Sequence, residues 1–166
     1  MHDRVMHSAT DIDRYPAPWR LVFAFAIAPL FGAVFLALLQ AEESVSLARL
    51  VAFIRLLSVG AFSATAIFGL PAYFVLRRVM EPSLINCALV GALVAVAPGF
   101  LLELLPMSEH FQFSIGGHAT VTDGSRTAWG WELWRASLIR TIVAGVVGGA
   151  VFWVLALSRV KAPKSA

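Results

Sequence analysis

The sequence predicts an all-α integral membrane protein, a bundle of four helices formed by one domain that covers residues 1–166. Hydrophobic residues make up 59% of the chain and charged residues only 14%, whereas about a quarter of a soluble domain is charged. The mean hydropathy is +0.79. The apolar residues fall into four blocks of roughly 20 residues, which is the length of a helix that crosses a ~30 Å hydrocarbon core.

The first two predicted helices cover about residues 21–39 and 52–76. Pro29 lies in the middle of the first and leaves the carbonyl of Phe25 without its helical donor, which membrane helices tolerate when neighbouring groups satisfy the carbonyl. Arg77 and Arg78 close the second helix. The link that follows is so short that the second and third helices must be antiparallel neighbours.

The third and fourth predicted helices cover about residues 84–105 and 136–157. The fourth has a face of small residues that includes Gly145, Gly148 and Gly149. Small residues allow two helix backbones to approach closely in a membrane. We therefore expect these three glycines to be helix-packing residues.

The loop at 106–135 is the only sizeable polar segment between the predicted helices, and it is expected to contain a β-hairpin. Gly116-Gly117 can adopt the positive φ angles of a two-residue turn between the flanking segments 110–115 and 118–122. Asp123-Gly124 offers a second turn. Three tryptophans then precede the last helix, as in the aromatic belt of a membrane surface, and residues 127–135 can form its first turns (Trp129, Trp131 and Trp134).

Matching fragments in the two halves of the chain suggest a parallel two-plus-two internal repeat. Ala-Ile-Ala-Pro ends at Pro29 in the first helix, and Ala-Val-Ala-Pro ends at Pro98 in the third. An Ile-Arg pair precedes a glycine by the same spacing in the second and fourth helices, which places Gly60 and Gly145 in equivalent positions. The hypothesis predicts that helices one and two superpose on three and four by a rotation near two-fold.

The basic residues predict the orientation of the bundle. Eight of them lie in the N-terminal segment, in the link between the second and third helices, and in the C-terminal segment, and five lie toward the opposite side. Because cytoplasmic segments carry the denser basic charge, both termini are expected in the cytoplasm and the 106–135 loop outside. The expected location is the inner, or plasma, membrane.

Arg55, Glu103 and Arg140 form the candidate polar cluster, since the predicted topology puts all three about one turn below the outer surface. Charged groups at this depth usually pair with one another or extend to the surface. We expect an ion pair between Glu103 and Arg140, with Arg55 as a second cation. Such a cluster could hold an anionic ligand or a lipid head group.

The sequence offers no catalytic, cofactor-binding or metal-ligating set. It contains no nucleotide-binding glycine loop, HExxH or CxxC pattern, and the single Cys87 lies inside an apolar block. The predicted hairpin does not bring His110, His118 and Asp123 together as three ligands. The net charge of +3 comes from residues that are spread along the chain, which argues against nucleic-acid binding.

These features favour a non-enzymatic accessory or regulatory subunit that binds membrane lipid or a protein partner, or forms a homo-oligomer. The glycine face of the fourth helix, or the external loop, is then expected to contact another chain. The alternative is a minimal dimeric transporter or channel for a small or anionic solute, which the kinked helices and the repeat favour. A third hypothesis, an enzyme acting on lipid, has no general base with a partner.

Overall fold

The computed structural model describes residues 16–41, 46–79, 83–105 and 110–158 of the 166-residue chain. In this part, four helical segments are long and apolar enough to cross a membrane. They are α1 (Pro18–Gln40), the continuous α2 (Leu47–Ala64), η2 (Thr65–Gly69) and α3 (Leu70–Val79), then α4 (Leu84–Glu103), and finally α5 (Ala128–Phe152) with η3 (Trp153–Leu157). The predicted four-helix architecture is confirmed at this level.

Local capping explains where the helices begin. The Ser83 hydroxyl accepts a hydrogen bond from the backbone N–H of Asn86 at 3.1 Å, and α4 starts at the next residue. The Thr127 hydroxyl accepts from Gly130 N–H at 3.0 Å, so α5 starts at Ala128. Such side chains satisfy amide groups that have no partner within a helix.

The last helix starts earlier than the predicted boundary at 136. Because Thr127 caps it, the tryptophan-containing segment that precedes the apolar block is helical, as the sequence allowed for 127–135. The α5 and η3 segments together comprise 30 residues, about 45 Å at 1.5 Å per residue. This length exceeds the ~30 Å hydrocarbon core of a bilayer, so an untilted helix of this length would extend beyond the core.

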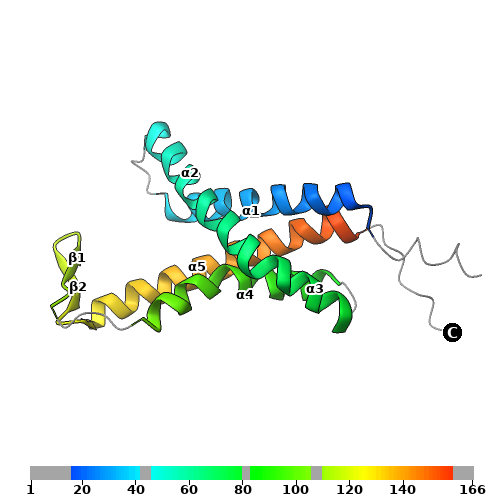
Figure 1. Cartoon of the computed structure of the whole chain (residues 1–166). Coiled ribbons are helices and arrows are strands. Elements are labelled where there is room, and N and C mark those ends of the chain that lie inside the picture. Colours follow the sequence, from blue (N-terminus) through cyan, green and yellow to red (C-terminus); the bar gives the residue numbers. More distant parts are fainter. Residues whose placement is uncertain (1–15, 42–45, 80–82, 106–109, 159–166) are drawn as a thin grey trace, which may run out of the picture.

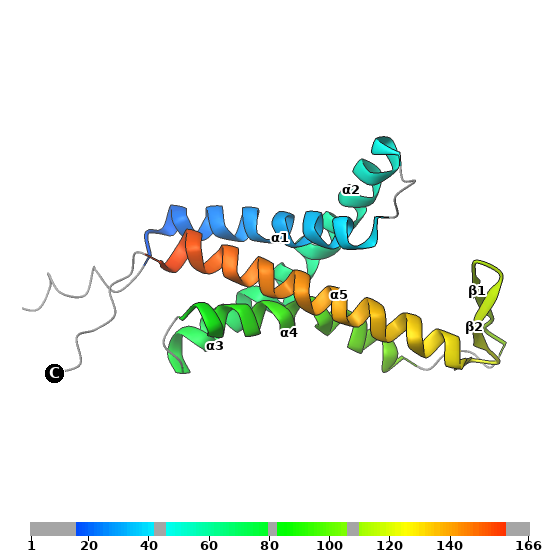
Figure 2. The ribbon, with the colours of Figure 1, turned by 180° about the vertical axis from the view of Figure 1, so that it is seen from behind.

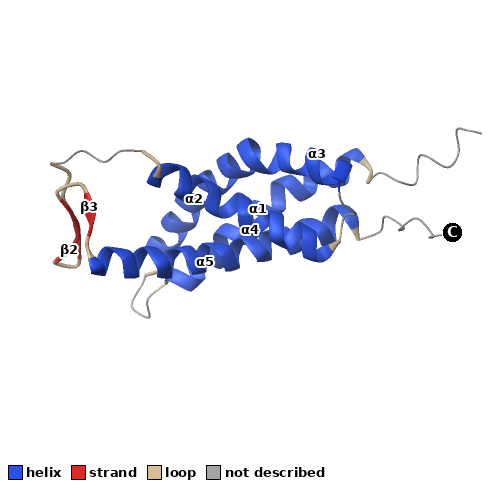
Figure 3. Ribbon diagram, turned by 90° about the horizontal axis from the view of Figure 1, so that it is seen from below, coloured by secondary structure: helices blue, strands red, loops and turns tan. Residues whose placement is uncertain are grey.

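Three of the four segments form a layer, with α5 between α1 and α4, and the α2–η2–α3 segment runs diagonally across it (Figures 1 and 2). The start of α1 and the end of α5 lie together at one end of the bundle, where α3 also ends. We call this the termini end. The strands lie beyond the opposite end, which we call the sheet end (Figure 3).

Glycine allows α4 and α5 to pack almost backbone to backbone. A Cβ atom on Gly145 would lie 2.6 Å from the carbonyl oxygen of Gly91, and one on Gly149 would collide with the carbonyl of Cys87. On the other side, a Cβ atom on Gly148 would lie 3.4 Å from the Ala28 carbonyl in α1. The glycine face is therefore occupied by α4 and α1 of the same chain and is not open to another chain.

A small antiparallel sheet at the sheet end contains the predicted hairpin. Its strands are β1 (Phe113–Ile115), β2 (His118–Thr122) and β3 (Ser125–Arg126), in the order β1-β2-β3. Gly116 and Gly117 have φ angles of 59° and 82°, as the two-residue turn requires. The second predicted turn is also present, with φ of 48° at Asp123 and 71° at Gly124.

The sheet is fixed to the first turn of α5. Thr127 donates its backbone N–H to the Thr120 carbonyl at 3.0 Å and its hydroxyl to the Ala119 carbonyl at 2.7 Å. Gly130 faces the Thr120 backbone so closely that a Cβ atom would overlap its carbonyl oxygen. The side chain of Thr120 is buried and donates to the Phe113 carbonyl at 2.9 Å.

Candidate functional site

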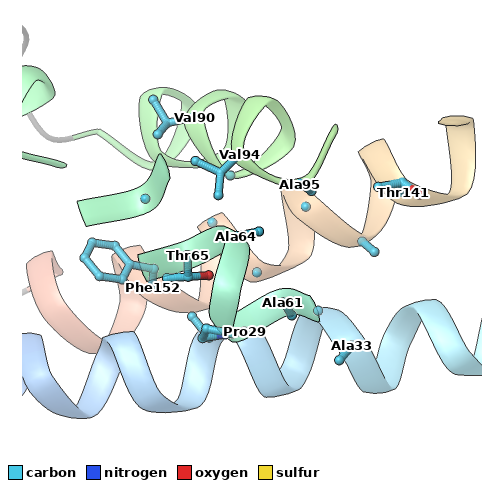
Figure 4. A pocket seen from close by; sticks show the side chains of 18 of the residues that line it. Pro29, Ala33, Ala61, Ala64, Thr65, Val90, Val94, Ala95, Thr141 and Phe152 are labelled. Carbon is cyan, nitrogen blue, oxygen red and sulfur yellow. The ribbon is translucent and has the colours of Figure 1, made fainter. Parts of the chain in front are cut away.

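The most prominent feature of the bundle is a cavity of about 360 Å³ between the diagonal α2–η2–α3 segment and the α1–α5–α4 layer (Figure 4). All four helical segments contribute to its wall. The volume lies at the lower end of the ~300–1,000 Å³ of small-molecule sites. Its lining on α5 extends from Thr141 to Phe152, a distance of about 16 Å along the helix.

The wall of the cavity is almost entirely apolar. Most of the residues that line it are alanine, glycine, leucine, valine, proline or phenylalanine. The polar side chains of the lining are Thr65, Tyr73 and Thr141, together with the thiol of Cys87. Among the described residues, no Asp, Glu, Lys, Arg or His lines the cavity, so hydrocarbon is the chemistry that its surface matches.

The sequence produces this space by placing small residues where the diagonal segment faces the layer. Gly60 in α2 has nothing within 4 Å of the position where a Cβ atom would lie, and Gly32 and Ala33 of α1 line the cavity. The π-helical turn η2 adds Thr65 and Gly69 to the wall. Such turns widen a helix locally and occur frequently at functional sites.

An aromatic cluster bounds the cavity at the termini end. The ring of Tyr73 in α3 makes edge contacts with Phe25 of α1 and Phe152 of α5, each at 5.9 Å between ring centroids. Phe25 and Phe152 are themselves 4.9 Å apart. Tyr73 is only 8% exposed, so these three rings connect three helices at this end.

The predicted ion pair between Glu103 and Arg140 is wrong, because the structure gives Glu103 a different partner. Arg126, at the end of β3, forms a bidentate ion pair with the Glu103 carboxylate, and its Nε donates to Oε2 at 3.2 Å. Within the described part of the chain, no ion pair joins Glu103 to Arg55 or Arg140. Both of these arginines are exposed.

The register of α4 against α5 explains this difference. Gly91 lies against Gly145, and four residues earlier Cys87 lies against Gly149, so the two helices run antiparallel. Extending this register puts Glu103 level with about residue 133, and Arg140 about seven residues, or ~10 Å, deeper. The predicted cluster assumed that the last helix began at 136, which placed Arg140 only one turn below the surface.

Arg55 is also directed away from the cavity. Its neighbours on the cavity wall include Leu57, Ala61 and Ala64, which recur at helical spacing. At 100° per residue, Arg55 lies about 160° around α2 from Leu57, on the opposite face. A role for Arg55 and Arg140 in ligand binding stays a prediction.

The remaining polar candidates lie in the sheet and its surroundings. His118 pairs with Ile115 across the hairpin, as predicted, and its ring lies 5.4 Å from that of Trp129. Asp123 occupies the turn between β2 and β3. In the described residues, no group of three His, Cys, Asp or Glu side chains is arranged to hold a metal ion.

Glu103→Gln is expected to loosen the connection between the sheet and α4. Both side chains of the ion pair are partly buried, 25% exposed for Glu103 and 20% for Arg126, so removing the charge weakens a pair with limited access to water. We expect the thermal unfolding temperature to fall by a few degrees, corresponding to about 1–3 kcal/mol for charged hydrogen bonds. Arg140→Gln is the matched control and should change the unfolding temperature much less.

Sequence reasoning missed Tyr73 and the cavity. The signal for Tyr73 was present, since it is a lone tyrosine inside an apolar block, one turn before Arg77. The cavity itself depends on the distance between the diagonal segment and the layer, which residue types alone do not determine.

Comparisons of the chain with models of protein families, with curated proteins and with solved structures found no match.

Proposed function

We propose that this chain is a non-enzymatic integral membrane protein that binds the hydrocarbon chain of a membrane lipid in the cavity between its four helical segments. The observation that carries the proposal is the cavity wall, which comes from all four segments and has no ionisable group other than Tyr73 and Cys87 among the described residues. A lipid chain that fills the cavity makes van der Waals contacts with this wall, whereas an empty cavity leaves the wall atoms without those contacts.

Exposed large apolar side chains support a membrane location. They occur on every helical segment, at positions where water contact would be unfavourable (for example Phe31, Leu56, Ile85 and Val154). Since the basic residues are denser at the termini end, we propose that this end lies in the cytoplasm and that the protein belongs to the inner, or plasma, membrane.

Transport of a small anion remains the alternative, and the cavity favours it less. Sites for coupling ions and charged solutes usually present polar or charged groups near the bilayer midplane. The described lining of this cavity has no charged group, and its polar side chains are limited to Thr65, Tyr73, Thr141 and the thiol of Cys87. A hydrophobic chain needs no such groups.

The proposed internal repeat is consistent with the same cavity. Pro29 and Pro98, which the repeat makes equivalent, both line it, and so do Gly60 and Gly145. The near two-fold rotation that would relate the halves stays a prediction.

Gly60→Leu should abolish lipid retention without disturbing the backbone, because the new side chain extends into open space on the cavity wall. The measurement is native mass spectrometry of protein extracted gently from membranes. We expect the wild-type protein to keep one lipid per chain. The affinity of the variant for lipid should fall at least about tenfold, which is equivalent to about 1.4 kcal/mol of binding free energy.

Gly99→Leu is the matched control. Gly99 also has nothing within 4 Å of its Cβ position, but it does not line the cavity. This variant should retain lipid as the wild type does. Equal retention in all three proteins, or a retained second protein in place of lipid, would overturn the proposal.

A further inference from the structure

We infer that the cavity selects an anionic phospholipid from the leaflet at the termini end, with its phosphate at Arg77 and one acyl chain in the cavity. The inference rests on the proposed function. Beyond the proposed function, it names the class of lipid, the leaflet and the residue that recognises the head group.

The first argument is the position of Arg77 relative to the wall. Tyr73 lines the cavity at its termini end, and Arg77 follows it by four residues in α3, so the two side chains lie on one face of the helix. The Arg77 guanidinium lies close enough to the Tyr73 hydroxyl for the two groups to interact. A cation thus lies one helical turn beyond Tyr73 and directly follows Leu76, which also lines the cavity.

The second argument is the distribution of charge. Among the described residues, the termini end carries Arg20, Arg77 and Arg78. The described carboxylates all lie toward the sheet end, where Glu103 pairs with Arg126 and where Asp123 and Glu132 also lie. The described part of the termini end therefore carries only basic charge, which is complementary to an anionic head group.

The third argument is length. The lining extends about 16 Å along α5, from Phe152 near the termini end to Thr141. One leaflet contributes about half of the ~30 Å hydrocarbon core, or ~15 Å. A lipid whose phosphate contacts Arg77 can therefore lay a single chain along the whole cavity.

The packing of α3 against the layer is light. Tyr73 is the one buried residue of α3, and Phe74, Val75 and Val79 are exposed. The helix is held to the layer by that ring more than by close contact along its length. Between α3 and the start of α4, Leu76, Cys87 and Val90 continue the wall of the cavity, and Leu76 packs against the buried cluster that contains Cys87. Entry of an acyl chain at this point therefore requires a small outward movement of α3.

Arg77→Gln in the full-length protein provides the test. The protein is reconstituted into vesicles of equal parts phosphatidylglycerol and phosphatidylcholine with identical chains, and the lipid retained after extraction is identified by native mass spectrometry. We expect the wild type to retain phosphatidylglycerol in excess. The variant should lose this preference by about tenfold, while still retaining one lipid per chain.

Arg78→Gln is the matched control, because Arg78 carries the same charge but lies 100° further around the helix. It should change the preference by less than about twofold. Arg77→Lys keeps the charge and should keep most of the preference, which guards against a variant that fails to fold.

The outcomes separate this inference from the proposed function. Lipid retained without any preference for phosphatidylglycerol, or an equal loss of preference in Arg77→Gln and Arg78→Gln, overturns the head-group inference alone. Lipid retention that is unchanged by Gly60→Leu overturns the proposed function, and the inference with it.

Discussion

Gly149→Ala is expected to destabilise the bundle more than any other single methyl addition to α5. The added Cβ would overlap the carbonyl group of Cys87, which belongs to the α4 backbone and cannot rotate away as a side chain could. The two helices must therefore separate along their closest contact. Overpacking of this kind costs about 1–3 kcal/mol, measurable as a lower unfolding midpoint in detergent.

Gly148→Ala controls for the change in helix propensity. It is the preceding residue of the same helix, but its added methyl would meet the Ala28 carbonyl at 3.4 Å, an ordinary contact. We expect no loss of stability, and a gain of up to about 1 kcal/mol from removing a glycine within a helix. Equal midpoints for the two variants would mean that the close approach of α4 and α5 does not exist.

Gly130→Ala is expected to detach the sheet from the bundle while leaving the bundle folded. The added methyl would overlap the Thr120 carbonyl oxygen, which also accepts the Thr127 N–H that anchors β2. The local opening free energy should fall by about 1–3 kcal/mol. Amide hydrogen exchange of residues 118–126 should accelerate by at least about fivefold, since exchange reports local opening.

The exchange rates within α1 and α4 should remain as in the wild type. Gly99→Ala, whose methyl would extend into open space, should leave the sheet unchanged. Slow exchange of 118–126 in Gly130→Ala would contradict the docking of the sheet on α5.

The four long apolar helices were predictable because the length and composition that a membrane-spanning helix requires can be recognised in a sequence. A helix that satisfies its own backbone and carries about 20 apolar residues is readable from hydropathy alone. The hairpin was predictable for a similarly local reason, since Gly116-Gly117 provides the two positive φ angles that its turn needs. The boundary at 136 was wrong because hydropathy marks where a segment becomes apolar, whereas Thr127 decides where its helix begins.

The polar cluster could not be predicted because ion pairing depends on register and depth. The sequence places several arginines near the same end of the bundle as Glu103. A shift of a few residues in the packing of α4 on α5 changes which of these arginines contacts the Glu103 carboxylate. The chosen partner, Arg126, lies outside the predicted helix, at the end of a short strand. The two-residue β3 that positions it follows a turn with φ of 71° at Gly124, and its own sequence has no strong strand signal.

The small residues of the fourth helix were recognised, but not what they pack against. A stripe of glycines predicts that another helix packs closely against it, but not which helix. A helix of another chain was therefore as good a candidate as α4. The structure assigns Gly145 and Gly149 to α4 and Gly148 to α1. The same three glycines also line the cavity, so the glycine face belongs to the interior of the bundle.

The most direct test of a lipid chain in the cavity is a nuclear Overhauser measurement between acyl-chain protons and alanine methyl groups. Ala64 and Ala144 line the cavity and are only 8% and 5% exposed, whereas Ala37 is fully buried outside it. We predict contacts from chain methylenes to the Ala64 and Ala144 methyls and none to Ala37. Contacts confined to outward-facing methyls such as those of Leu89 and Leu93 would contradict the account.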